Sequence, residues 1–400
     1  MRILRIIARL NVGGPARHVV WLTRNLSNDD FDSVLVAGSV PEGEEDMAYF
    51  ARQNGVEPLF IPQMSRELSL RDFVSLGKIY RTIAKYQPDI IHTHTAKAGT
   101  VGRLAAFLYK WLTPRTLVGR PREVRVIHTF HGHVFHSYYG PVKTKIFLMI
   151  ERLLARFATD RIIVISAQQL DEINGRFRVG RREQFAVVPL GLDLELFEKV
   201  HSDRSVIRNE LGVGEREVVV GYTGRLTEIK NLPLLIQAAR ALPDLRFLII
   251  GDGTLRAEMQ AGAPANVTFL GNREDVARLL SAFDIIALTS KNEGTPLSLI
   301  EAMAAGVPFV STAVGGVVDL AGDVIRSDAS VDICERGVLV RQESVHLFAE
   351  GLALLAGNRE LRERLSRNGA AFARSAYSME RLTKDMSALY RGLFTATEDG

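Results

Sequence analysis

Two cations in the second half of the chain have the type and spacing expected of a phosphate site. The segment VVVGYTGRLTEIKN begins as an apolar strand pattern ending at Gly224, and Arg225 and Lys230 follow before a helix predicted over residues 231–241. Two cations beside a helix start stabilise the negative charge of a diphosphate leaving group. The alternative is two solvated surface cations, but the carboxyl end of a strand is where open α/β sheets bind ligands.

Two carboxylates lie around a second predicted helix start. The segment NEGTPLSLIEAMAAGVPFVST holds Glu293 and Glu301, with a helix expected to begin near Ser298. Glu301 then falls in the first turn and Glu293 on the loop before it. A carboxylate so placed can accept both vicinal hydroxyls of a ribose, as in dinucleotide sites. Taken alone, such a pair is more commonly a helix cap or a surface ion pair.

A glycine pair follows the first predicted strand. Gly13 and Gly14 precede Pro15, which suits the first position of a helix. Glycines let backbone amides approach a ligand, and a helix start presents free N–H groups to phosphate. Most Gly-Gly turns are only tight turns, so this pair is weak evidence by itself.

Six histidines of the first half are close enough in sequence to be considered as metal ligands, because imidazole is a common zinc ligand. The favoured interpretation is that the HTH segment at a strand end lines the binding site and that one of the histidines is a core residue. The six are His92, His94, His128, His131, His133 and His136.

The elements that position these residues follow the alternation of strands and helices typical of parallel sheets. The alternation runs to Phe197, is interrupted by a polar stretch over residues 198–217, and then restarts. A chain of 400 residues is also too long for one ordinary core. We therefore expect two doubly wound α/β domains, residues 1–197 and 198–376, and a last helix within residues 377–400 that crosses back to the first.

The composition argues against a disordered or fibrous chain and against a membrane-spanning one. The balance of 46% hydrophobic and 24% charged residues is that of a soluble globular enzyme. Cys334 is the only cysteine, Arg2, Arg5 and Arg9 interrupt the apolar start, and no apolar run reaches about 18 residues. These features predict a cytoplasmic enzyme without a membrane anchor.

The ordered set of motifs resembles family 4 of the retaining glycosyltransferases, which have the GT-B fold. The resemblance covers nearly the whole chain and implies two Rossmann-like domains facing across a cleft, a nucleotide-sugar donor, and no metal or other cofactor. The motifs are GGPARHVVWL, IIHTHTAKAG, HTFHGH, VVPLGLDLELF, GRLTEIKN, IIGDGTLRAEM, VTFLGNRED, NEGTPLSLIEAMAAGVPFV and the following VGG.

Carried over residue by residue, the resemblance assigns catalytic and donor-binding roles in the second half. It implies that Arg225 and Lys230 bind the donor diphosphate, that Glu301 binds the ribose hydroxyls, and that Glu293 lies near the transferred sugar. Enzymes similar to this one have no nucleophile placed for a covalent intermediate. The implied route is front-face attack, in which the departing phosphate takes the acceptor proton.

Further roles follow from the same resemblance. Gly14, next to Gly13, would contact the diphosphate or the acceptor. His131 matches the histidine that reaches the transferring sugar in similar enzymes. The stretch around Asn272 and Arg273 matches the loop that binds the base, largely through its backbone.

One departure from the family pattern affects the sugar contact. Many relatives have Phe-Gly where this chain has Thr295 and Pro296, and proline has no N–H to donate. The neighbouring amides of Leu297 and Ser298 are free to serve as donors instead.

The donor, acceptor and reaction leave alternatives open. We favour a UDP-sugar and an acceptor that is a lipid-linked or glycan intermediate of cell-surface polysaccharide synthesis. The alternatives are a GDP-mannose-dependent mannosyltransferase, a nucleotide-sugar epimerase or phosphorylase on the same fold, and a silent sugar-nucleotide-binding module. A nicotinamide-dependent dehydrogenase is disfavoured because the first loop has no G-x-G-x-x-G. No nucleic-acid partner is expected.

The first half carries a net charge of +8 and the second half −4. Within residues 97–125, cations alternate with aromatic residues, and we expect Leu104 and Leu108 to face inward with Lys110 and Trp111 at the surface. Such a surface suits an anionic inner-membrane face, and the enzyme would then be peripheral there. The alternative is that the aromatics are core residues and the arginines only solubilise the domain. The cations are Lys97, Arg103, Lys110, Arg115, Arg120, Arg122 and Arg125.

Overall fold

The computed structural model describes residues 1–11, 13–40, 46–64, 71–131, 141–198, 204–328 and 331–395. The chain forms two compact units. The first consists of Met1–Gly191 with Met379–Gly400, and the second is Leu192–Ser378. His133 and His136 lie outside the described residues.

The first unit is built on a seven-stranded sheet in the order β3-β2-β1-β4-β5-β6-β7, and every neighbouring pair is parallel. Helices connect the strands, as parallel pairing requires. The strands are β1 (Arg2–Ile7), β2 (Asp32–Ala37), β3 (Leu59–Phe60), β4 (Ile90–His94), β5 (Arg125–Thr129), β6 (Arg161–Val164) and β7 (Phe185–Val187). The helices are α1 (Gly14–Asn25), α2 (Ala48–Gln53), α3 (Arg71–Tyr86), α4 (Ala96–Trp111), α5 (Pro141–Phe157), α6 (Ala167–Leu170) and α16 (Met379–Thr395). Short 3₁₀ helices are η1 (Pro114–Val118) and η3 (Arg182–Gln184), and a short π-helix is η2 (Asp171–Arg176).

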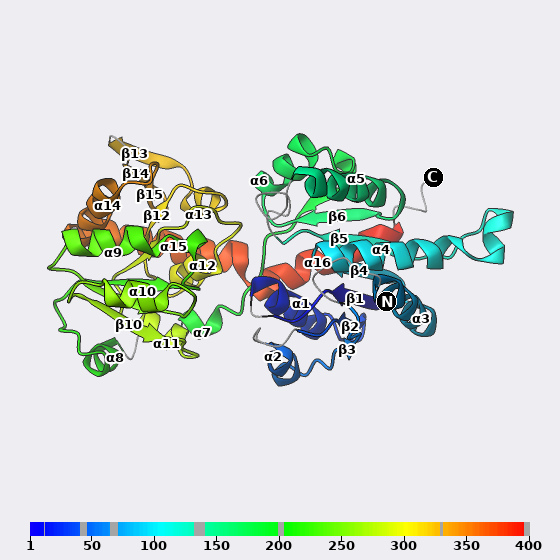
Figure 1. The fold of residues 1–400 in the computed structure, drawn as a ribbon, viewed down its shortest axis with the longest axis horizontal. Helices are drawn as coiled ribbons and strands as arrows, with labels where there is room; N and C mark the ends of the chain where they lie inside the picture. The colour runs from blue at the N-terminus through cyan, green and yellow to red at the C-terminus, as the bar shows by residue number, and fades with distance from the viewer. Residues whose placement is uncertain are drawn as a thin grey trace. The chain divides into compact units, whose positions relative to one another are not determined.

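Helices cover both faces of this sheet, as expected for a doubly wound fold (Figure 1). Successive strand residues point to opposite faces, so Leu4 packs in the cluster that contains residues of α3 and α4. Ile3 packs in the cluster that contains Leu22 of α1 and Met386 of α16. The last helix therefore completes the core of the first unit.

The second unit has an eight-stranded sheet in the order β10-β9-β8-β11-β12-β15-β14-β13. Its strands are parallel from β10 to β15, and β14 and β13 are antiparallel. The strands are β8 (Val219–Thr223), β9 (Arg246–Ile250), β10 (Val267–Gly271), β11 (Ile285–Leu288), β12 (Phe309–Thr312), β13 (Val324–Asp328), β14 (Val331–Cys334) and β15 (Gly337–Val340). The helices are α7 (Glu195–Glu198), α8 (Arg204–Glu210), α9 (Leu232–Ala241), α10 (Arg256–Ala261), α11 (Val276–Leu280), α12 (Leu297–Ala304), α13 (Val317–Ala321), α14 (Val345–Gly357) and α15 (Arg359–Tyr377), with the turn η5 (Glu228–Lys230).

The division between the units falls after Gly191, whereas the sequence led us to expect it near Phe197. The segment that follows Gly191 lies in the second unit because α7 packs against α11 and α12. The second division falls after Ser378. None of the described helices is long and apolar enough to span a bilayer.

Helix α4 differs from the expected orientation. Leu104 is 40% exposed rather than buried, because α4 turns Val101, Ala105 and Tyr109 toward the sheet. Arg103 on the same helix is fully buried and binds Glu151 of α5. Lys97 is also buried, in an ion pair with Asp72. Two of the cations assigned to a surface band are therefore internal. Trp111 is exposed, as expected.

Candidate functional site

Lys230 and Glu293 meet at the point where the strand order of the second sheet reverses. β8 and β11 are neighbours there, and their following loops leave the same edge in opposite directions, which is where such sheets bind ligands. Lys230 Nζ lies 2.5 Å from Glu293 Oε1. Ser290 Oγ donates to the same oxygen at 2.5 Å. A cation and a carboxylate 63 positions apart in sequence thus share one small region.

Backbone contacts hold these two loops together. The hydroxyl of Thr289 donates to the carbonyl of Lys230 at 2.9 Å. The amide of Lys291 donates to the carbonyl of Ile229, also at 2.9 Å. The position of Lys230 relative to Glu293 is therefore fixed by hydrogen bonds to the main chain of its loop as well as by the ion pair.

The loop that carries Glu293 rests on a pair of glycines after β12. The amide of Gly316 donates to the carbonyl of Glu293 at 3.3 Å. A Cβ at Gly315 would lie 1.8 Å from that same carbonyl oxygen, and Gly315 has a left-handed φ of 51°. A Cβ at Gly316 would lie 2.0 Å from the carbonyl of Gly294. Only glycines permit this close approach.

Glycines also pack beneath the loop that carries Arg225. A Cβ at Gly251 would lie 2.0 Å from the carbonyl oxygen of Gly224, and one at Gly253 would lie 2.4 Å from that of Leu226. The hydroxyl of Tyr222 donates to the carbonyl of Arg225 at 3.1 Å. The Arg225 side chain is exposed. The loop is thus closely packed on its inner side, while the Arg225 guanidinium is exposed.

Helix α12 begins one residue before the expected start, with Pro296 as its N-cap. The carbonyl of Pro296 accepts from the amides of Leu299 and Ile300. Leu297 and Ser298 are therefore the first two helical residues, whose amides have no carbonyl to bind within the helix. Glu301 is the fifth residue of α12, so it lies in the second turn and not in the first.

Asn272 and Arg273 follow β10 on an exposed loop. Arg273 donates to both carboxylate oxygens of Asp275, each at 2.7 Å. This bidentate pair raises the pKa of Arg273 and lowers that of Asp275 through the side-chain hydrogen bond. The contact closes the side chains of Arg273 and Asp275 on each other at this loop.

In the first unit, the predicted residues gather after β1, β4 and β5, again at the strand-order reversal. Gly13 is the N-cap of α1, Gly14 its first residue and Pro15 its second. His94 ends β4, and its Nδ1 lies 2.9 Å from Nε2 of His131, which follows β5. His131 is partly buried.

His18 of α1 was not identified from the sequence, although it belongs to the GGPARHV segment. One ring nitrogen from each of His18, His94 and His131 lies within 4.8 Å of the others, a grouping compatible with a metal ion. Besides burial, the neighbouring histidines and Arg5 lower the pKa of His18 and His94. Burial is the largest cause of each shift, and it lowers the pKa of His131 to about 4. All three imidazoles are neutral at pH 7.

The other described histidines of the proposed cluster bind protein groups. His92 Nδ1 lies 2.7 Å from the hydroxyl of Tyr390, and its Nε2 lies 2.7 Å from Thr129 Oγ1. His128 Nδ1 lies 2.9 Å from Thr93 Oγ1. Both imidazoles are fully buried, and burial lowers the pKa of each. These two are core histidines and not ligands.

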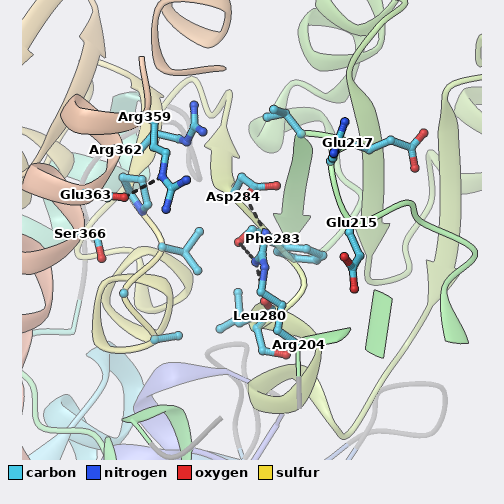
Figure 2. Close-up of a pocket in the computed structure, with 17 residues that line it drawn as sticks. Arg204, Glu215, Glu217, Leu280, Phe283, Asp284, Arg359, Arg362, Glu363 and Ser366 are labelled. Carbon is cyan, nitrogen blue, oxygen red and sulfur yellow. Dashed lines mark hydrogen bonds and ion pairs between the residues drawn. The ribbon is translucent and has the colours of Figure 1, made fainter. Parts of the chain in front are cut away.

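The second unit has a cavity of about 570 Å³ at the opposite edge of its sheet (Figure 2). Its lining includes Val218, Asp284 and Pro308, the residues immediately before β8, β11 and β12. Arg204 in its wall already binds Asp284 at 2.6 Å and the carbonyl of Ser281 at 2.7 Å. None of the predicted site residues lines this cavity, because they lie at the carboxyl ends of the strands and the cavity lies at the amino ends.

Comparisons with known families agree with the division of the chain into two units. The family model described as Glycosyltransferase Family 4 matches residues 12–196, and the model described as Glycosyl transferases group 1 matches residues 203–372. The chain belongs to glycosyltransferase family 4. It is a glycosyltransferase, and the prediction of two Rossmann-like units of the GT-B class is confirmed.

Individual relatives cover most of the chain. An Escherichia coli UDP-Gal:alpha-D-GlcNAc-diphosphoundecaprenol alpha-1,3-galactosyltransferase is 29% identical over 310 residues, or 73% of this chain and 74% of that protein. A D-inositol 3-phosphate glycosyltransferase of Mycobacterium marinum is 29% identical over 337 residues, or 80% of this chain and 68% of its own length. HepE from Anabaena, solved with UDP, has a TM-score of 0.77 at 22% identity and covers 98% of this chain and 100% of its own.

Proposed function

We propose that this family member is a retaining transferase that moves a hexose from a UDP-sugar to a lipid-linked saccharide acceptor. The observation that carries the proposal is the contact of Lys230 with Glu293 at the strand-order reversal of the second unit. The proposed donor agrees with the printed activity of the Escherichia coli relative and with the UDP and UDP-glucose complexes of HepE. The proposed acceptor agrees with the lipid diphosphate of the same relative.

In this proposal the second unit binds the donor. Lys230 and Arg225 contact the diphosphate, and the free amides of Leu297 and Ser298 add donors at the start of α12. Glu301 binds the ribose, and the backbone around Asn272 and Arg273 contacts the base. The cations stabilise charge that grows on the leaving phosphate, where fixed electrostatic groups are most effective.

Glu293 would contact the transferred sugar beside Lys230. Because both side chains are more than four-fifths buried, their contact is stronger than a surface ion pair. One oxygen of Glu293 is engaged by Lys230 and Ser290. The other is the group available for a sugar hydroxyl.

His131 and the glycine pair would act from the first unit. A neutral His131 offers one ring nitrogen to His94 and keeps the other for a hydroxyl of the transferring sugar. Gly13 and Gly14 would present backbone to the diphosphate or the acceptor. The attacking acceptor oxygen forms the new bond to the anomeric carbon, the bond to phosphate breaks, and the departing phosphate oxygen takes the acceptor proton. We assign the neutralising role to Arg225 and Lys230 and therefore propose activity without a metal.

Melting temperatures of the full chain with UDP-, GDP- and ADP-sugars test the donor assignment. A ligand at about 100 times its dissociation constant stabilises the folded state by roughly 2.7 kcal/mol. The proposal expects a shift with UDP-sugars that is lost in Glu301→Ala. A shift with GDP-mannose alone would replace the donor assignment with a mannosyltransferase. Turnover of UDP-sugar to an epimer without acceptor would replace the reaction.

A further inference from the structure

Helix α5 of the first unit exposes a row of large apolar side chains. Ile146, Met149, Leu153 and Phe157 are 48%, 55%, 50% and 58% exposed. Their spacing of three, four and four residues places them along one side of the helix. Contiguous exposed apolar surface of this kind is uncommon on soluble proteins and marks an interaction site.

The orientation of α5 is fixed by a buried ion pair on its inner side. Glu151 accepts from Arg103 of α4 at 2.7 and 2.6 Å, and both side chains are fully buried. Ala155 packs in the core on the same inner side. Rotation of α5 to bury its apolar row would separate a buried ion pair at a large cost. The row is therefore a stable feature of the surface.

Cations accompany the apolar row along its length. Lys145, Arg152 and Arg156 are exposed, and each directly precedes a member of the row in the sequence. The only acidic residue in the sequence of α5 is Glu151, which is paired inside. We call these three cations and the four apolar residues the α5 surface. Its exposed charge has a single sign.

The α5 surface continues into neighbouring basic and aromatic groups. A cavity of about 440 Å³ and another of about 250 Å³ both have Arg156 and Phe157 in their walls. The second cavity also reaches the end of α4, which packs against α5. The lining of these cavities also includes Trp111, Arg178, Arg181 and Lys110, which is paired with Asp160 at 3.5 Å.

We propose that the α5 surface lies on an anionic phospholipid bilayer. The apolar row would enter the boundary between headgroups and acyl chains, and the cations would bind lipid phosphates. A second copy of this chain is a poorer occupant, because two surfaces with the same positive charge repel each other across a symmetric interface. This surface differs from the one expected over residues 97–125, of which only the Lys110 and Trp111 end is continuous with it.

The position of α5 relates the bilayer to the proposed acceptor. His131 follows the carboxyl end of β5, and the chain enters α5 at Pro141 before running back to β6. The first turns of α5 are therefore nearest the sheet edge that carries His131. Delivery of a lipid-linked acceptor to that edge rests on the proposed function, whereas attachment to lipid does not.

Vesicle co-sedimentation of the full chain tests the proposal. Vesicles of phosphatidylcholine mixed with phosphatidylglycerol are compared with phosphatidylcholine alone, at low and high salt. Wild type should bind only the anionic vesicles, and binding should weaken as salt rises. Lys145→Ser and Arg156→Ser should each weaken binding about fivefold. The triple variant Met149→Ser, Leu153→Ser, Phe157→Ser should weaken it at least tenfold, on the order expected for removing three inserted side chains.

A matched control replaces the exposed apolar pair Leu59 and Phe60 of β3 with serine and should bind as wild type does. Melting temperature and the shift given by UDP are measured for every variant, so that loss of lipid binding is separated from loss of folding or of donor binding. Equal binding by wild type and the α5 variants, or no binding by wild type, would overturn the proposal. Sedimentation of wild type as a dimer that Leu153→Ser dissociates would assign the surface to a second copy instead.

Discussion

At the scale of single residues, Lys230 has one role that the structure shows and a second that the proposed reaction assigns to it. It neutralises Glu293 in the ion pair described above, and in the proposed reaction it neutralises the leaving phosphate. The second role is needed most when charge develops on the phosphate. A substitution should therefore affect turnover more than donor binding.

Lys230→Ala is expected to lower kcat about 100-fold or more, the loss typical of one electrostatic stabiliser. Lys291→Ala is the matched control, because Lys291 is an exposed cation on the facing loop. The control should keep near wild-type kcat. Steady-state kinetics and melting temperature are measured for both, and an equal effect of the two substitutions would contradict a specific role for Lys230.

Glu301→Ala is expected to raise the dissociation constant of UDP about tenfold or more, because hydrogen bonds to a charged group contribute roughly 1.5 to 3 kcal/mol. Isothermal titration of the folded variant provides the measurement. Glu258→Ala, an exposed carboxylate of α10, is the control. Unchanged UDP affinity in Glu301→Ala would end the ribose assignment.

At the scale of elements, the site depends on how closely loops approach one another. Gly315 and Gly316 after β12 support the loop of Glu293, and Gly251 and Gly253 after β9 support the loop of Arg225. Each contact joins the ends of two strands that are neighbours or near neighbours in the sheet. Side chains at these glycines would push the proposed catalytic groups apart without touching the donor.

Gly315→Ala illustrates this dependence. Its Cβ would meet the Glu293 carbonyl, and its φ of 51° disfavours any residue with a Cβ. We expect at least a tenfold loss of kcat, on the order seen when a catalytic group is displaced by about 1 Å. Gly357→Ala is the control, because no atom lies within 4 Å of the Cβ it would add. Full activity in Gly315→Ala would show that the loop contact is dispensable.

Much of the fold was predictable because the strands of parallel sheets are continuous apolar runs, as in VVVGYT before Gly224. The strands β13 to β15 and the helices α14 and α15 were not predicted. β13 is exposed along its whole length and has no apolar run to mark it. The pairing of Lys230 with Glu293 could not be predicted from the sequence, because it depends on β8 and β11 being neighbours in the sheet. The role of Gly315 depends on a contact across the sheet in the same way.

At the scale of the whole molecule, the histidines make the stability of the first unit depend on pH. Burial lowers the pKa of each, to about 4 for His131, so the native chain binds fewer protons than the unfolded chain below about pH 6.5. The free energy of unfolding therefore has its full value with respect to these histidines above about pH 6.5. It decreases as pH falls below that value, because the unfolded chain takes up protons that the folded chain does not. The residues are His18, His92, His94, His128 and His131.

The free energy of unfolding should decrease by up to about 1.4 kcal/mol per pH unit for each of these histidines as pH falls from about 6.5 to 5. Denaturant titrations across this range provide the slope. His18→Asn should reduce it by one histidine's share, while His346→Asn on the exposed side of α14 should not. A slope that His18→Asn leaves unchanged would contradict the assignment of the dependence to this cluster.

The central claim is retaining transfer of a hexose from a UDP-sugar to a lipid-linked saccharide, carried out without a metal. Proton NMR of the product tests it most directly, with the UDP-sugar that gives the largest melting shift and an N-acetylglucosaminyl diphosphate lipid as acceptor, in the presence of EDTA. The account predicts a new glycosidic bond with the donor's anomeric configuration. An inverted product, or a product formed only when a metal is restored, would contradict it.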